Sequence, residues 1–169
     1  MVAGLNAVQP YDWAGFWNQR LHSTSPHAPL GGVEGSGWKL SYDATRSDMW
    51  KDVEEDRKAM DLSYSAGLVV ATDDGTISDV VFGGPAQKAG IAPSAKLIAV
   101  NGRQFTPTVL REAVADTAAG KPLELLIKTG DFYETHRIDY AGGERYPHLV
   151  RDSSQPDLLT AVISPLAKR

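Results

Sequence analysis

Apolar and polar positions divide the chain into three zones, of which the first covers residues 1–61. Trp13, Phe16 and Trp17 recur at helical spacing and predict an amphipathic helix with one strongly aromatic face. Thr45 begins a T-x-x-D sequence, which is typical of the start of a helix. The zone is therefore expected to hold a helix over 10–22, a loop over 23–37, a short strand over 38–42 and a charged helix over 46–60.

The second zone, residues 62–140, consists of short apolar runs separated by clear turn signals. Asn101-Gly102 is a strong signal for a two-residue hairpin. Pro85 favours the first position of a short helix, and Gly90 and Gly120 favour helix ends. We expect strands over 62–71, 76–82, 96–100, 103–105, 123–128 and 132–140, with one short helix from Pro85 and a longer one over 108–119.

The third zone, residues 141–169, is expected to be a tail with a short helix over about 156–163. Its apolar residues predict that it docks on the domain rather than remaining disordered. The order of strands and helices places the chain in the α+β class, with extensions at both ends of one domain.

Composition narrows the function. The chain has 169 residues, a formal net charge of -4 and no run of Lys or Arg, which argues against nucleic acid or an anionic membrane as a partner. No apolar stretch approaches the roughly 20 residues needed for a membrane span. The absence of cysteine excludes disulfides, thiol catalysis and cysteine-based zinc sites. The start lacks the features of a secretory signal, so we expect Met1 to be an internal or added start.

Three motifs of the second zone stand in the order and approximate spacing of PDZ domains of bacterial proteases. They are A-G-L at 66–68, G-P-A-x-x-A-G at 84–90 and A-V-N-G at 99–102. Ser94 and Ala95 depart from the Gly-Asp pair that many such domains carry. The resemblance implies a PDZ domain over 62–140, a partly open barrel or sandwich of five or six short strands with two helices. Residues 1–61 are then an N-terminal extension and residues 141–169 a docked tail.

A wider resemblance covers almost the whole chain, through Q-P-Y-D-W-A-G-F at 9–16, P-H-A-P-L-G-G-V at 26–33, G-W-K-L at 37–40, D-L-S-Y-S-A-G-L at 61–68 and R-Y-P-H-L at 145–149. Together they resemble the C-terminal portion of glycyl-aminopeptidase-like metallopeptidases, bacterial hydrolases in which a thermolysin-like zinc domain precedes a PDZ domain. The resemblance implies a parent zinc aminopeptidase, periplasmic or secreted, whose catalytic domain is a partner of this chain.

The chain lacks the residues for that chemistry. A peptidase of this kind needs H-E-x-x-H on a helix, and none of the four histidines is followed by Glu. We therefore expect no catalytic residue, no bound metal and no cofactor in this chain, with zinc confined to the parent's missing catalytic domain.

In PDZ domains an extended peptide adds as a strand to a sheet edge, and backbone N–H groups of a loop hold its terminal carboxylate. The resemblance places the loop at Ser65, Ala66, Gly67 and Leu68, the continuing edge at Val69 and Val70, and the opposite wall on the 108–119 helix at Thr108, Arg111 and Val114. Partner or substrate C-termini are then the expected ligands. Ala66 replaces a larger apolar residue and should enlarge the terminal pocket.

Two alternatives stay open for this groove. Gly67 is either a functional position for close backbone approach or only a bulge in a groove that the first zone fills. In the second case the domain is a structural module that packs on the peptidase domain and orients it. A free-standing adaptor is a third hypothesis, which requires Met1 to be the true start.

Other candidates have simpler interpretations. Arg57 and Lys58 would add positive charge beside the loop, but residues of a charged helix face are more often solvated. A metal at His22 and His27 lacks a third ligand, and a triad of Ser63 or Ser65 with His136 lacks the G-x-S-x-G sequence. The aromatic face of the first helix favours packing on a core or another domain.

Overall fold

The computed structural model describes residues 1–25 and 28–165, and these form two compact units. One unit combines Met1–Gly37 with Ser153–Arg169, and the other is Trp38–Asp152. The described residues hold seven α-helices and nine strands in open sheets with no closed barrel, which confirms the α+β class.

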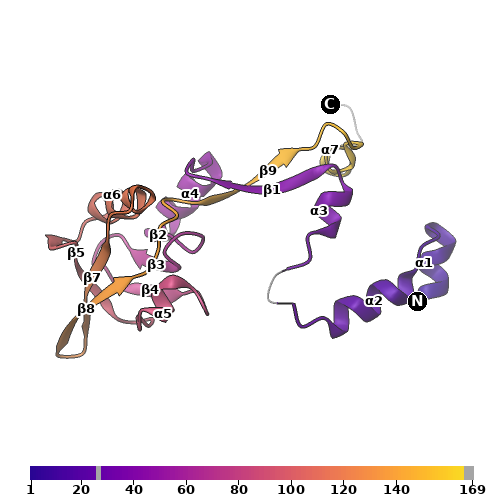
Figure 1. Ribbon diagram of the computed structural model, residues 1–169. Helices are drawn as coiled ribbons and strands as arrows, with labels where there is room; N and C mark the ends of the chain where they lie inside the picture. The colour runs from indigo at the N-terminus through magenta and orange to yellow at the C-terminus, as the bar shows by residue number, and fades with distance from the viewer. Residues whose placement is uncertain (26–27, 166–169) are drawn as a thin grey trace. The chain divides into compact units, whose positions relative to one another are not determined.

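The first unit is helical: α1 (Val2–Val8), α2 (Trp13–His22), α3 (Gly31–Gly35) and α7 (Leu158–Ile163) (Figure 1). Asp12 caps α2 by accepting a hydrogen bond of 2.9 Å from the Gly15 amide. The Ser36 carbonyl oxygen accepts a bond of 3.1 Å from the Leu158 amide, which links the end of α3 to α7. The predicted loop over 23–37 therefore contains a short helix, and the predicted helix over 10–22 begins three residues later.

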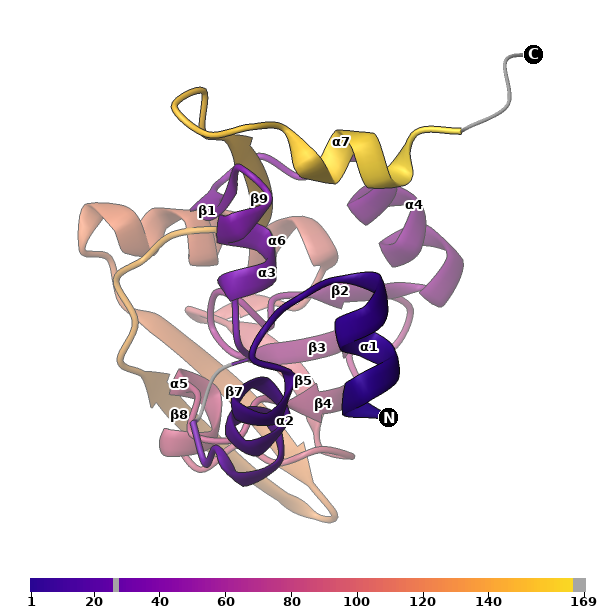
Figure 2. The same cartoon turned by 90° about the vertical axis from the view of Figure 1, so that its right-hand side faces the viewer.

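The second unit contains three antiparallel sheets (Figures 1 and 2). A ribbon pairs β1 (Trp38–Asp43) with β9 (Tyr146–Arg151). A three-stranded sheet has the order β2 (Ala59–Asp61), β3 (Leu68–Ala71), β4 (Ile77–Val80). A four-stranded sheet has the order β6 (Arg103–Gln104), β5 (Lys96–Val100), β7 (Leu123–Thr129), β8 (Phe132–Ile138).

Three helices complete this unit: α4 (Asp48–Arg57), α5 (Pro85–Lys88) and α6 (Pro107–Asp116), which continues as a 3-10 turn over Thr117–Ala119. The core contains apolar side chains from the two larger sheets, from α6 and from the loop before β3. They include Leu62, Leu68, Leu97, Leu110 and Leu125, all at most 1% exposed. Burial of these side chains supplies most of the stabilisation of the unit.

The predicted helix over 46–60 is shorter in the structure. Ser47, rather than Thr45, caps it, because the Ser47 hydroxyl accepts a bond of 3.2 Å from the Trp50 amide. Lys58 takes a left-handed φ of 47° and ends the helix, and the next three residues form β2. Pairing with β3 overrides the local helix pattern here, as tertiary context often does.

The first half of the tail predicted for 141–169 contains a strand in the structure. Tyr146–Arg151 forms β9 and pairs with β1 over six residues, from Trp38 opposite Arg151 to Asp43 opposite Tyr146. The compact unit Trp38–Asp152 consequently extends beyond residues 62–140 on both sides.

Candidate functional site

The edge of β3 that sequence reasoning assigned to a peptide is paired with β2. Met60 lies opposite Val70 and Asp61 opposite Val69, while β4 occupies the other side of β3. β3 is therefore an internal strand, and its backbone groups are paired within the sheet.

The loop before β3 is closed by Leu62. Its carbonyl oxygen accepts hydrogen bonds of 2.9 Å from the amides of both Ser65 and Gly67, and its own amide donates to the Leu68 carbonyl oxygen at 2.9 Å. The Leu62 side chain is fully buried in the core. Two of the loop donors expected to hold a carboxylate thus hold a carbonyl oxygen of this chain.

Gly67 is required by its surroundings. Its φ is 80°, a conformation that residues with a Cβ rarely adopt, and a Cβ there would lie 3.2 Å from Pro85 Cδ. Its carbonyl oxygen accepts a bond of 2.9 Å from the Val81 amide. The close approach is therefore made to the start of α5 in the same chain.

Replacing Gly67 with Val is expected to destabilise the protein more than the same change at Gly102. Both positions have positive φ, 80° and 75°, but a Cβ at Gly102 meets nothing within 4 Å. The difference should be about 1 to 2 kcal/mol, because only Gly67→Val also crowds Pro85. Urea unfolding of both variants measures it, and equal losses would contradict the close approach.

The other residues of the predicted loop are buried and bond to other parts of the same chain. Ser65 is only 3% exposed, and its hydroxyl accepts a hydrogen bond of 2.9 Å from the Arg145 amide. This bond connects the loop to the segment before β9. The Ala66 carbonyl oxygen accepts from the Ala86 amide at 3.0 Å, so the loop also holds α5. Ala66, Leu68 and Val70 are fully buried in the core.

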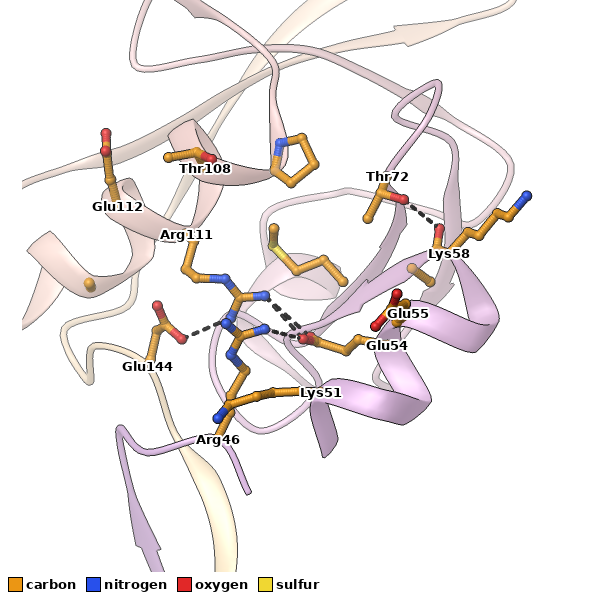
Figure 3. Close-up of a pocket in the computed structure, with 14 residues that line it drawn as sticks. Arg46, Lys51, Glu54, Glu55, Lys58, Thr72, Thr108, Arg111, Glu112 and Glu144 are labelled. Carbon is orange, nitrogen blue, oxygen red and sulfur yellow. Dashed lines mark hydrogen bonds and ion pairs between the residues drawn. The ribbon is translucent and has the colours of Figure 1, made fainter. Parts of the chain in front are cut away.

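A crevice of about 940 Å³ is lined mainly by residues of α4, β2 and α6 (Figure 3). β2 contributes Ala59 and Met60 to the lining, and α6 contributes Thr108 and Arg111. Val114 is fully buried and does not line the crevice, unlike the other two residues predicted for the α6 wall. The volume is typical of ligand sites in proteins.

Arg111 crosses from α6 to α4 beside this crevice (Figure 3). Its Nη2 lies 3.2 Å from Glu54 Oε2, and its Nη1 donates to Glu144 Oε2 at 3.0 Å and to the Tyr146 hydroxyl. Glu54, 7% exposed, also accepts from Arg46 at 2.7 Å and from the Asp61 amide at 2.9 Å. One carboxylate therefore connects α4, β2 and α6.

The pKa values of Arg111 and Tyr146 are both raised. Burial acts to lower the pKa of Arg111, but its neighbours Tyr146, Glu54 and Glu144 outweigh it and raise that pKa. Burial raises the pKa of the Tyr146 phenol, and its hydrogen bond to Glu144 adds to the effect. Arg111 thus stays charged and Tyr146 stays a neutral donor.

Sequence reasoning identified Arg111 but missed Glu54, Glu144 and Tyr146. Glu54 lies on a helix whose many charged residues resemble a solvated face, so nothing local distinguishes it. Its partner Arg111 is 57 residues away, and only the fold brings the two together.

The minor candidates are dispersed. Lys58 lines the crevice and its carbonyl oxygen accepts from the Thr72 amide at 2.9 Å, while Arg57 is exposed. His22 Nδ1 lies 2.9 Å from the Asn18 carbonyl oxygen, and His136 Nδ1 lies 2.8 Å from that of Ala89. His27 lies outside the described residues, among which no group of three metal-ligating side chains is found.

No protein-family model matches the sequence, and no curated protein matches it. Among solved structures, an aminopeptidase N family protein from Idiomarina loihiensis matches 96% of this chain at 14% identity and a TM-score of 0.58. The fold is thus shared with part of that protein, of which this chain spans 28% of the length.

The HtrA3 PDZ domain, in a crystal structure with a phage-derived ligand (FGRWV), matches 67% of this chain and 92% of that domain. The identity is 18% and the TM-score 0.34, too low to support an inference. Within the described ranges, the chain has no helix that is long and apolar enough to cross a membrane.

Proposed function

We propose that this chain is an accessory module of a larger peptidase-like polypeptide, with a PDZ-like groove filled by its own β2. The observation that carries the proposal is the pairing of β2 with the β3 edge, together with the Leu62 carbonyl oxygen on the Ser65 and Gly67 amides. The structural match to 28% of an aminopeptidase N family protein supports the idea of a larger parent.

In this role the module packs on the rest of the polypeptide and orients it. The rings of Trp13, Phe16 and Trp17 on α2 stack edge to face, and no residue of α2 is buried. Such a face is suited to a protein contact. The proposal includes a parent zinc aminopeptidase, bacterial and exported, with the metal and the hydrolysis in a domain outside this chain.

A library of C-terminal peptides, each with an amidated control, tests this function on the intact chain. We expect no saturable binding, because the Ser65 and Gly67 donors are already bonded to Leu62. Binding that is lost on amidation would show an open carboxylate loop and overturn the proposal.

Peptide binding is the second candidate function. It would use the same loop, Ser65 to Leu68, the edge at Val69 and Val70, and the α6 wall at Thr108 and Arg111, after β2 has left. The observation in its favour is that α4, the helix before β2, has one buried residue, Glu54, which is paired with Arg46 and Arg111. Partner or substrate C-termini would then bind by strand addition.

A further inference from the structure

We infer that residues 48–62, here called the strap, act as an intramolecular ligand latched by the Glu54–Arg111 pair, and that unlatching lets an internal peptide segment of apolar-x-apolar pattern replace β2. The inference rests on the proposed function, since it requires that β2 fills the groove. It adds the chemistry of the ligand and the contact that controls its entry.

The strap shows which ligand the groove accepts. Met60 and Leu62, two residues apart on an extended backbone, are 2% and 0% exposed and both join the core. Asp61 between them is partly exposed. A ligand that takes their place needs two apolar side chains at this spacing, with a tolerant residue between them.

The loop recognises a carbonyl oxygen of an internal residue. Leu62 is followed by Ser63, so the acceptor of the Ser65 and Gly67 amides is a peptide carbonyl, not a terminal carboxylate. A ligand bound in the same way needs no free C-terminus, and its affinity should not depend on amidation.

The latch follows from how α4 is attached. Its apolar residues Met49 and Val53 are 67% and 37% exposed, and Glu54 is its one buried residue. Trp50 is half-buried and packs edge to face on Tyr64 and Tyr146, so the ion pairs of Glu54 act beside one aromatic contact. Glu54 pairs with Arg111 and Arg46 and holds the Asp61 amide of β2. If Glu54 loses its charge, the two guanidinium groups and the Asp61 amide lose the carboxylate that balanced them. The contact of α4 with β2 and α6 is then weaker.

Arg111 has a second acidic partner, Glu144, at 3.0 Å. A neutral residue at 54 therefore leaves Arg111 paired to the segment before β9 while weakening the attachment of α4. The body of the unit should stay folded when the strap loosens, because Met60 and Leu62 are the strap's two core residues and the other core residues lie outside it.

The test uses a labelled peptide with the sequence K-A-M-D-L of residues 58–62, acetylated and amidated, titrated onto the intact chain. Glu54→Gln is expected to bind it about tenfold more tightly than the unmodified protein, since the apparent affinity scales with the open fraction. Glu112→Gln is the matched control: it removes an exposed pair with Arg103, 3.1 Å apart, on the same helix as Arg111, and should change nothing. K-A-S-D-S should not bind.

A disulfide provides the lock. Ala59 lies opposite Ala71 on the paired strands β2 and β3. Backbone hydrogen bonds join Lys58 to Thr72 and Leu62 to Leu68, so the alternation of an antiparallel ladder makes Ala59–Ala71 a non-hydrogen-bonded pair. The Cα atoms of such pairs are close enough for a disulfide. The sequence has no cysteine, so Ala59→Cys with Ala71→Cys introduces the only two thiols. In the Glu54→Gln background, oxidation should abolish K-A-M-D-L binding and reduction should restore it.

Each outcome is decisive. If Glu54→Gln is folded and binds no better than the parent protein, or binds equally well when oxidised, the latch inference is overturned while the filled groove stands. If the unmodified chain binds free C-termini but not amidated ones, the proposed function itself fails. Should Glu54→Gln not fold, Arg46→Met, which removes one partner of Glu54, is expected to show a smaller gain, and no gain there overturns the inference.

Discussion

Replacing Leu62 with Ala is expected to lower the free energy of unfolding by about 2 to 5 kcal/mol. The side chain is 0% exposed and belongs to the core of the Trp38–Asp152 unit, so its removal loses apolar burial and leaves a cavity. The backbone carbonyl that closes the loop is retained in this variant, which isolates the contribution of the side chain.

Urea unfolding measures this loss, with Leu149→Ala as its control. Leu149 is 46% exposed on β9, and its truncation should change stability by less than about 1 kcal/mol. Equal effects of the two substitutions would mean that residue 62 is not part of the core and that β2 does not lie in the groove.

Arg111→Ala is expected to destabilise the unit by about 2 to 4 kcal/mol. The change leaves Glu54 and Glu144, whose side chains are 8% and 12% exposed, without their shared cation. The loss is placed below the value for a fully buried pair because the Arg111 side chain itself is 21% exposed. Arg103→Ala is the control, because the side chains of Arg103 and its partner Glu112 are 64% and 55% exposed. It should lower the free energy of unfolding by less than about 1 kcal/mol.

A double-mutant cycle separates the pair from simple loss of packing. Arg111→Ala combined with Glu54→Gln should destabilise less than the sum of the two single changes, because the second removes a charge that the first left unpaired. If the losses in the free energy of unfolding add strictly, the two side chains do not interact in solution. That result would contradict the latch inference.

Elements with strong local signals could be predicted closely from the sequence. Asn101 and Gly102 take positive φ values of 49° and 75°, which is the turn that their residue types favour, and β5 runs over the predicted Lys96–Val100. Pro85 begins α5 as expected. In each case a fixed backbone preference of one or two residues decides the structure.

Elements that depend on distant pairing could not be predicted. β2 follows a helix whose pattern gives no sign of where it stops, and its strand character comes from β3. β9 finds its partner β1 more than a hundred residues earlier, so its sequence resembles a tail. The same cause limited the site, because local motifs suggested the loop residues, whereas most of β2 was assigned to the predicted helix over 46–60.

Amide hydrogen exchange at Ser65 and Gly67 tests the filled groove most directly, since these donors point to Leu62 and not to a ligand. We predict that both amides of the intact chain exchange as slowly as amides of the central strands β5 and β7, in the absence of any added peptide. Exchange at the rate of solvent-exposed loop amides would show that Leu62 does not close the loop, and would contradict the proposed function.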